Sequence, residues 1–123
     1  ELGAKNGALH YQEILNNVGC FDVVLLSMGE DGHTSSLFPN HLYDKSASVV
    51  VECNSPKHPK NRISISYSRF NQAKNIFKII SGSSKQKVVK FWLEGKVLPI
   101  NKIYGESEKV FITKNALKPS NIV

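Results

Sequence analysis

The chain has 123 residues, of which 41% are hydrophobic and 21% are charged, a balance typical of one globular domain with a packed core. This composition argues against a disordered chain, a collagen-like repeat and a miniprotein held together by disulfides. The longest apolar run, Val23 to Leu26, is far shorter than the ~20 residues that a membrane-spanning helix requires, so we expect no membrane association.

The net charge of +6 is divided unevenly along the chain. Residues 1–56 carry two lysines and seven acidic residues, whereas residues 57–123 carry fourteen lysines or arginines and three acidic residues. The second half therefore favours an anionic partner, either a phosphorylated metabolite or a nucleic acid. Because the lysines are not interleaved with aromatic residues, as they are where single strands stack, we expect no nucleic-acid partner.

Targeting and metal-binding signals are both missing from the sequence. The first twenty residues contain no apolar block that ends in small residues, so we expect no signal peptide and a cytoplasmic location. Cys20 and Cys53 have neither CxxC spacing nor a histidine pair beside them, which argues against a zinc site. We interpret them as reduced thiols in the core or at strand ends, with a single disulfide left open.

The first predicted element is a helix whose apolar residues recur at i, i+3, i+4 and i+7, namely Tyr11, Ile14, Leu15 and Val18. Gly19 stands where a left-handed residue would end this helix. The run Phe21 to Leu26 is apolar without alternation, which is typical of a strand covered on both faces in a parallel sheet. We therefore predict a central strand there.

Two further strands are predicted in the middle of the chain. Residues 46–53 form the first, and residues 62–66 form the second, in which apolar and polar residues alternate. Residues 55–59 between them contain two prolines and are predicted to be a loop. Ser68 is suited to cap a short helix after the second strand.

The last third of the chain begins with a predicted strand at residues 75–81. Ser83 and Gln86 have the spacing of a capping box, and Gly95 is suited to end the helix that it opens. The buried stripe of this helix is predicted to comprise Val88, Val89, Phe91, Trp92 and Leu93. Residues 110–113 form a final strand. Strands alternating with helices predict an α/β fold with an open, mostly parallel, Rossmann-like sheet flanked by helices.

A glycine-rich loop follows the first strand, at the edge of the sheet where α/β proteins bind ligands. Gly29 and Gly32 allow the backbone to turn sharply and to approach a ligand closely. Asp31 can orient the imidazole of His33, whose ordinary pKa of about 6.5 suits general acid/base catalysis. A simple turn with an exposed histidine fits these residues equally well. The loop has no G-x-S-x-G elbow and no GxxxxGK[ST] motif, and the pair lacks further metal ligands.

Residues 21–39, FDVVLLSMGEDGHTSSLFP, closely resemble the signature block of 6-phosphogluconolactonases. Three further segments resemble the same family in the same order, at residues 55–64, residues 81–85 and Leu98-Pro99. The resemblance covers essentially the whole chain. It implies a carboxylic ester hydrolase that converts 6-phosphoglucono-δ-lactone to 6-phosphogluconate in the oxidative pentose phosphate pathway.

Within this resemblance, His33 would be the general base and then the general acid, with no metal or other cofactor. Asp31 would hold the imidazole or the attacking water, and backbone N–H groups of the loop around Gly29 and Gly32 would stabilise the oxyanion. Arg62 and Lys85 would bind the phosphate by resemblance to the family. The remaining histidines lie in segments without catalytic spacing and are interpreted as surface residues: His10, His41 and His58.

Family members are much longer than this chain, and their first half supplies a glycine- and serine-rich loop and an Asp-Glu-Arg segment. Since residue 1 is Glu, we expect residues 1–123 to be the C-terminal portion of a single sugar-phosphate lactonase domain, missing the N-terminal half. Half a sheet would expose a strand edge and an apolar face, which favours self-association or pairing with the missing half.

Two other functions stay open at this stage. Glucosamine-6-phosphate deaminases have a similar loop but continue into Phe-Asn-Glu-Pro, whereas this chain has Leu37-Phe38-Pro39-Asn40 without the Glu. An amino-sugar-phosphate isomerase or deaminase is therefore the second hypothesis. The third is a non-catalytic anion-binding fragment, which the positive charge of residues 57–123 favours.

Overall fold

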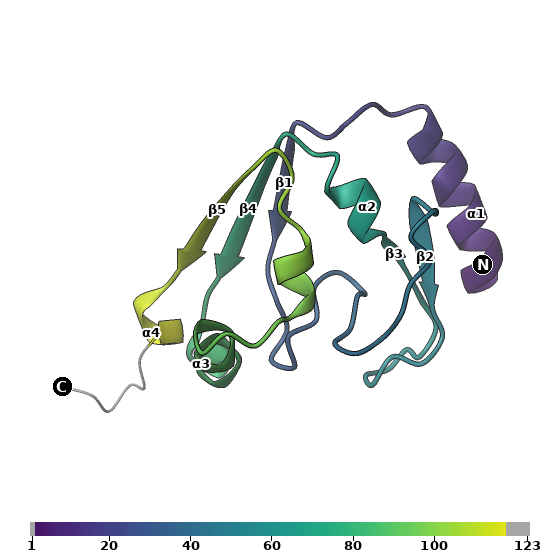
Figure 1. Cartoon of the computed structure of the whole chain (residues 1–123). Coiled ribbons are helices and arrows are strands. Elements are labelled where there is room, and N and C mark those ends of the chain that lie inside the picture. The colour runs from purple at the N-terminus through teal and green to yellow at the C-terminus, as the bar shows by residue number, and fades with distance from the viewer. Residues whose placement is uncertain (1, 118–123) are drawn as a thin grey trace.

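The computed structural model describes residues 2–117 and gives them an α/β fold (Figure 1). The elements in chain order are α1 (Gly3–Asn16), β1 (Val23–Leu26), β2 (Val49–Glu52), β3 (Arg62–Ile65), α2 (Tyr67–Phe70), β4 (Asn75–Ile80), the 3₁₀ turn η1 (Ser83–Lys85), α3 (Gln86–Leu93), the 3₁₀ turn η2 (Pro99–Lys102), β5 (Ser107–Ile112) and α4 (Lys114–Leu117). The fold class predicted from the sequence is confirmed.

The main sheet has three parallel strands in the order β1-β4-β5. The prediction that β1 is central is wrong, because β4 lies between β1 and β5. Val23 is 52% exposed and Leu25 is 64% exposed, so only one face of β1 is covered. An apolar run without alternation therefore did not indicate burial on both faces here.

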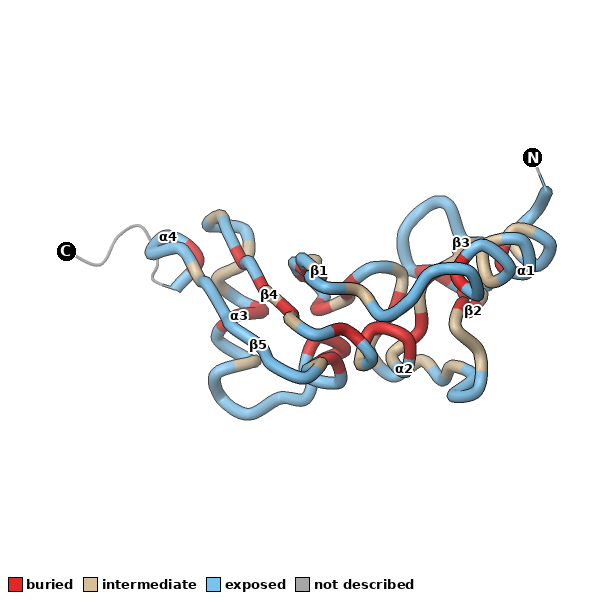
Figure 2. Tube along the Cα trace, turned by 90° about the horizontal axis from the view of Figure 1, so that it is seen from above, coloured by how far each residue is buried: buried red, intermediate tan, exposed pale blue. Residues whose placement is uncertain are grey.

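The two faces of the main sheet differ in the described part of the chain. On one face, Leu26, Ile76 and Ile80 are buried beneath residues from α3, α4 and η2, and these form the main core. The other face exposes apolar side chains from all three strands: Val23, Leu25, Ile79 and Phe111. Figure 2 shows the buried stretches along the middle of the molecule, with β5 exposed along its length.

Strands β2 and β3 pair with each other in an antiparallel hairpin and are not part of the main sheet. Ala8 and Leu15 of α1 pack with Val49 of β2 in a second, smaller core. The predicted apolar face of this helix is only partly correct, because Ile14 and Val18 are exposed. The hairpin and α1 lie beside the sheet on the side of β1 (Figure 1).

Two helix ends differ from the prediction. Helix α1 ends at Asn16, before Gly19, because the side-chain amide of Asn17 donates to the Glu13 carbonyl at 3.2 Å and caps the last turn. In α2 the N-cap is Ser66, not Ser68, because the Ser66 hydroxyl accepts the Arg69 N–H at 3.1 Å.

The capping box predicted for α3 does not form. Residues 83–85 make a 3₁₀ turn before the helix, so Ser83 and Gln86 do not occupy its N-cap and N3 positions, and the Gln86 amide donates to the Asn115 carbonyl. Of the predicted stripe, Val88 and Val89 are buried, Trp92 is partly buried, and the other two residues are exposed. The stop at Gly95 is confirmed by its φ of +95°.

The remaining elements follow the prediction more closely. Strand β4 begins where expected and ends one residue earlier, at Ile80, and β5 begins three residues earlier than expected, at Ser107. Cys20 and Cys53 are free and exposed, and they flank strands rather than occupying the core. Across residues 2–117, every helix is too short or too polar to cross a lipid bilayer.

Candidate active site

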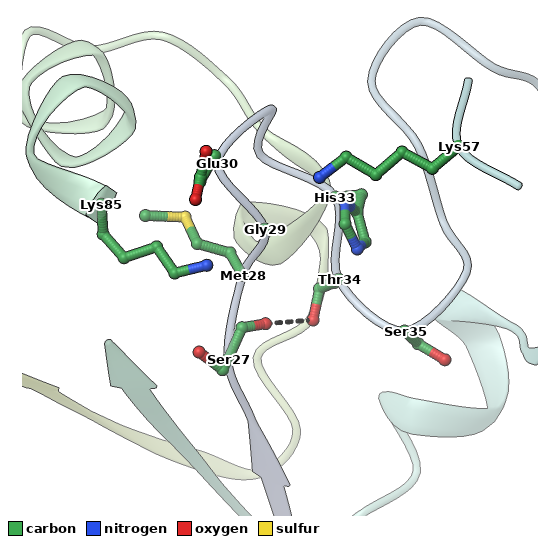
Figure 3. A pocket seen from close by; sticks show the side chains of 9 residues that line it. All are labelled: Ser27, Met28, Gly29, Glu30, His33, Thr34, Ser35, Lys57 and Lys85. Carbon is green, nitrogen blue, oxygen red and sulfur yellow. Dashed lines mark hydrogen bonds between the residues drawn. The ribbon is translucent and has the colours of Figure 1, made fainter. Parts of the chain in front are cut away.

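A pocket of about 430 Å³ lies beyond the carboxyl ends of β1 and β4 (Figure 3). It is lined by loop residues 27–30 and 33–35, by Lys57 and by Lys85. The loop follows β1, and Lys85 follows β4. Because β1 and β4 are parallel neighbours, their carboxyl ends bring these two segments to one edge of the sheet.

The His33 ring is held by Asp31. Its Nδ1 lies 2.5 Å from the Asp31 Oδ1, and the His33 backbone N–H donates to the same oxygen at 3.1 Å. The Nε2 atom has no hydrogen-bond partner among residues 2–117. The carboxylate therefore fixes one ring nitrogen and leaves the other without a partner, an arrangement in which an imidazole can transfer a proton.

The pKa of the Asp31 carboxyl lies below its ordinary value. Partial burial raises this pKa, but the hydrogen bonds from the His33 N–H and ring, with the positive charges of His33 and Lys57, outweigh that effect. Asp31 is thus an anion over a wide pH range and can orient the imidazole.

Gly29 and Gly32 give the loop its shape. A Cβ at Gly29 would lie 2.2 Å from His33 Cε1, so only glycine leaves room for the ring. Gly32 has a φ of +92°, and a Cβ there would lie 2.8 Å from Leu98. Their N–H groups donate within the loop, to the carbonyls of His33 and Gly29, so an oxyanion donor from this loop would have to be another N–H group.

Strand β3 supports the far side of the loop. The Ser64 hydroxyl lies 2.7 Å from the Ser35 hydroxyl and accepts the Ser36 N–H at 3.3 Å. Ser35 has a φ of +53°, a conformation that non-glycine residues adopt at a cost and that these contacts maintain. Within the loop, the Thr34 hydroxyl donates to the Ser27 carbonyl at 2.7 Å, which is the dashed line in Figure 3.

Phe38 forms the surface against which the imidazole packs. Its side chain is 1% exposed, and its ring stacks on His33 with 4.8 Å between centroids and 29° between planes. His33 is therefore fixed through its Nδ1 and through one ring face.

Two lysines supply positive charge to the pocket, and Figure 3 shows them entering from opposite sides of the loop. Lys85 is one of the cations expected from the sequence. Its ammonium group forms no hydrogen bond or ion pair within the described residues and is available to an anion. Lys57 was not among the expected site residues, although it lies in the expected proline-containing loop.

Arg62, the other expected cation, is not among the residues that line the pocket. Its guanidinium donates to the carbonyls of Lys57, His58 and Pro59 at 3.0–3.2 Å and lies 5.6 Å from the centroid of the Phe38 ring. These contacts hold the loop that carries Lys57.

The other histidines divide into two groups. His10 and His58 are exposed, as predicted. His41 is half-buried, and its Nδ1 lies 2.8 Å from a carboxylate oxygen of Glu52, so the interpretation of His41 as a simple surface residue is wrong. A histidine and a glutamate eleven residues apart show no local pattern that would reveal this pair. Among the described residues, no three His, Cys, Asp or Glu side chains are grouped so that they could hold a metal ion.

The site is chemically suited to hydrolysis of an ester that bears an anionic group. A fixed imidazole with a free Nε2 can accept a proton from the water that attacks an ester carbonyl carbon. The lysines that line the same pocket can bind an anionic group elsewhere on that ester.

Comparisons with known proteins identify the family of this chain. A family model described as glucosamine-6-phosphate isomerases/6-phosphogluconolactonase matches residues 2–112. The chain is 36% identical over 119 residues to 6-phosphogluconolactonase 3 of Saccharomyces cerevisiae, covering 89% of this chain and 47% of the relative. It is 40% identical over 81 residues to a probable 6-phosphogluconolactonase of Drosophila melanogaster, covering 63% and 33%.

Solved structures share the fold. The crystal structure of 6-phosphogluconolactonase from Leishmania guyanensis superposes with a TM-score of 0.75 at 25% identity, covering 97% of this chain and 54% of that one. A monomeric glucosamine-6-phosphate deaminase, at 23% identity and a TM-score of 0.71, shows the same fold. The chain spans about half the length of the curated relatives that it matches. The match over residues 2–112 places this chain in the glucosamine-6-phosphate isomerase/6-phosphogluconolactonase family.

Proposed function

We propose that this chain carries the catalytic histidine and the phosphate-binding lysine of a 6-phosphogluconolactonase. The substrate is 6-phosphoglucono-δ-lactone and the product is 6-phosphogluconate. One observation carries the proposal: the Asp31-bound imidazole of His33 and the unpaired ammonium of Lys85 line one pocket. The curated relatives are named as 6-phosphogluconolactonases, which supports the same reaction.

His33 acts twice in the proposed mechanism. Its Nε2 takes a proton from water as the water oxygen attacks the lactone carbonyl carbon, which forms a tetrahedral oxyanion. When the bond between that carbon and the ring oxygen breaks, the imidazolium returns the proton to the departing oxygen. Asp31 keeps the ring oriented and stabilises its charged form.

The oxyanion requires donors other than the N–H groups of Gly29 and Gly32, which are occupied within the loop. Glu30 lines the pocket and its N–H group has no acceptor among the described residues, and we assign the role to this group. Gly29 and Gly32 serve the site through their shape.

Lys85 binds the phosphate of the substrate, and Lys57 adds a second positive charge on the opposite side of the loop. Arg62 acts indirectly, because its guanidinium is committed to the carbonyls of residues 57–59. A substrate anchored through its phosphate would place its carbonyl carbon near the loop, as proximity catalysis requires.

The test is hydrolysis of the lactone above its spontaneous rate, measured as acid release in the protein that contains this chain. Replacing His33 with Asn should lower the catalysed rate by about 10²- to 10⁴-fold while the far-UV spectrum stays unchanged. Full activity in the His33→Asn variant would refute the mechanism. Release of ammonia from glucosamine 6-phosphate, with no lactone hydrolysis, would instead identify a deaminase.

Three expectations from the sequence stay predictions. They are the assignment of residues 1–123 to the C-terminal portion of one lactonase domain, pairing with an N-terminal half or with a second copy, and a cytoplasmic location. One relative, from Arabidopsis thaliana, is named as chloroplastic.

A further inference from the structure

Glu52, the last residue of β2, is a buried acid outside the pocket. It is 4% exposed, and both carboxylate oxygens are occupied. Oε1 lies 2.8 Å from His41 Nδ1 and accepts the Asn54 N–H at 3.2 Å, and Oε2 accepts the Tyr43 hydroxyl at 2.8 Å. Burial raises the pKa of Glu52, but the His41 and Tyr43 hydrogen bonds outweigh it and lower the pKa, so the group is a carboxylate.

The Tyr43 hydroxyl connects this carboxylate to the pocket. While it donates to Glu52, its oxygen accepts the backbone N–H of Phe38 at 2.9 Å. The Phe38 ring in turn stacks on His33, and 5.8 Å separates the centroids of the His41 and Phe38 rings. A continuous set of contacts thus runs from β2 through Tyr43 and Phe38 to the imidazole.

Burying a carboxylate costs several kcal/mol, and an apolar residue of similar size often stabilises a fold as well or better. A directional polar network, in contrast, fixes its members in one arrangement. The members of this network other than Glu52 and Asn54 belong to residues 38–43, which directly follow the loop that carries His33. We therefore expect the network to fix the position of the His33 loop more than that of the β2–β3 hairpin.

We propose that Tyr43 and Glu52 are positioning residues for His33, acting by fixing the Phe38 ring on which the imidazole stacks. This inference rests on the proposed function of His33 as the general base. Fixed position matters because displacing a catalytic group by about 1 Å can cost about 100-fold in rate.

The chain provides a matched control. Tyr67 is in edge contact with Tyr43, with 6.2 Å between ring centroids, but its buried hydroxyl has no hydrogen-bond partner within the described residues. Tyr43→Phe removes the link to Phe38 and keeps the ring, whereas Tyr67→Phe removes a buried hydroxyl that has no partner. The two variants therefore separate the network from the loss of a hydroxyl.

The experiment records the ring-proton NMR signals of His33 in both variants, together with kcat and KM for the lactone. In Tyr43→Phe we expect the His33 signals to move downfield as the ring current of Phe38 is lost, and kcat to fall by about tenfold with little change in KM. In Tyr67→Phe we expect neither change. Unmoved His33 signals in a folded Tyr43→Phe variant would overturn the inference.

A second variant and the independence of the NMR signals from turnover give a clear result in every case. If Tyr43→Phe does not fold, Glu52→Leu replaces the carboxylate with an apolar side chain that a purely structural role tolerates. Moved His33 signals in folded Glu52→Leu support positioning, and unmoved signals contradict it. Because the NMR signals do not depend on turnover, absence of lactone hydrolysis would refute the proposed function while the signals still decide the positioning role.

Discussion

The His33 end and the Lys85 end of the pocket are built in different ways. His33 is held through Nδ1 by Asp31 and through its ring face by Phe38. Lys85 lines the same pocket, yet its ammonium group has no hydrogen bond or ion pair among residues 2–117. One end is fixed by contacts within the chain, and the other is left for an anion.

This difference separates two kinds of contribution. A group that is fixed before substrate arrives lowers the barrier without reorganisation, so disturbing it should mainly lower kcat. A cation that meets a remote phosphate contributes binding in both the ground state and the transition state, so its loss should mainly raise KM. Substitutions at the two ends can establish or break this distinction.

Among substitutions that leave His33 and Lys85 themselves in place or test the open end, the largest effect is expected at Gly29, which leaves room for the fixed ring. In Gly29→Ala the new Cβ would lie 2.2 Å from His33 Cε1, so the imidazole must move. We expect kcat for the lactone to fall by about 100-fold. Gly19→Ala is the matched control, because a Cβ there meets nothing within 4 Å. Equal activity in the two variants would show that the His33 position is not critical.

A smaller effect is expected at the open end. Lys85→Gln removes the charge and keeps most of the side chain, so KM should rise by about tenfold, equivalent to ~1.4 kcal/mol, with kcat nearly unchanged. Lys87→Gln is the control, because Lys87 is an exposed residue of the first turn of α3 that does not line the pocket. Steady-state kinetics on both variants measure whether the rise in KM is specific to Lys85. A matching rise in KM for Lys87→Gln would indicate a general charge effect.

The smallest effect concerns the stability that Asp31 contributes. Its folded pKa is lowered, so its contribution is present above the ordinary aspartate pKa and is lost as the pH falls through the folded value. Chemical denaturation should find Asp31→Asn less stable than the wild type by under about 1 kcal/mol at pH 7, because the pair is partly exposed. The difference should shrink below pH ~4. A constant difference down to pH ~2 would mean that the carboxylate charge has no role.

Part of the site was predictable because its signals are local in the sequence. The glycine-rich loop after β1 and the turn before Lys85 could be placed at one sheet edge, since parallel strands share the direction of their carboxyl ends. The close spacing of Asp31 and His33 also predicted their contact.

Other features depend on contacts between distant segments. Strand β1 lies at the sheet edge because β4 lies between β1 and β5. The apolar run of β1 alone does not predict this strand order. Lys57 reaches the pocket because Arg62 holds its loop, and Tyr43, in the segment before β2, meets Glu52 at the end of that strand. Two helix ends were predicted wrongly for a local reason: the side-chain amide of Asn17 caps α1 before Gly19, and a 3₁₀ turn at residues 83–85 comes before the first residue of α3.

The most direct measurement is an NMR titration of this chain with 6-phosphogluconate, followed through backbone amide signals. We expect saturable shifts concentrated at residues 29–36, at Lys57 and at Lys85, a set that includes most of the residues lining the pocket. The Lys85→Gln variant should weaken binding, and Lys87→Gln should not. Shifts spread evenly over exposed lysines of the second half, or no shifts at the loop, would contradict recognition of a sugar phosphate by the His33–Lys85 pocket.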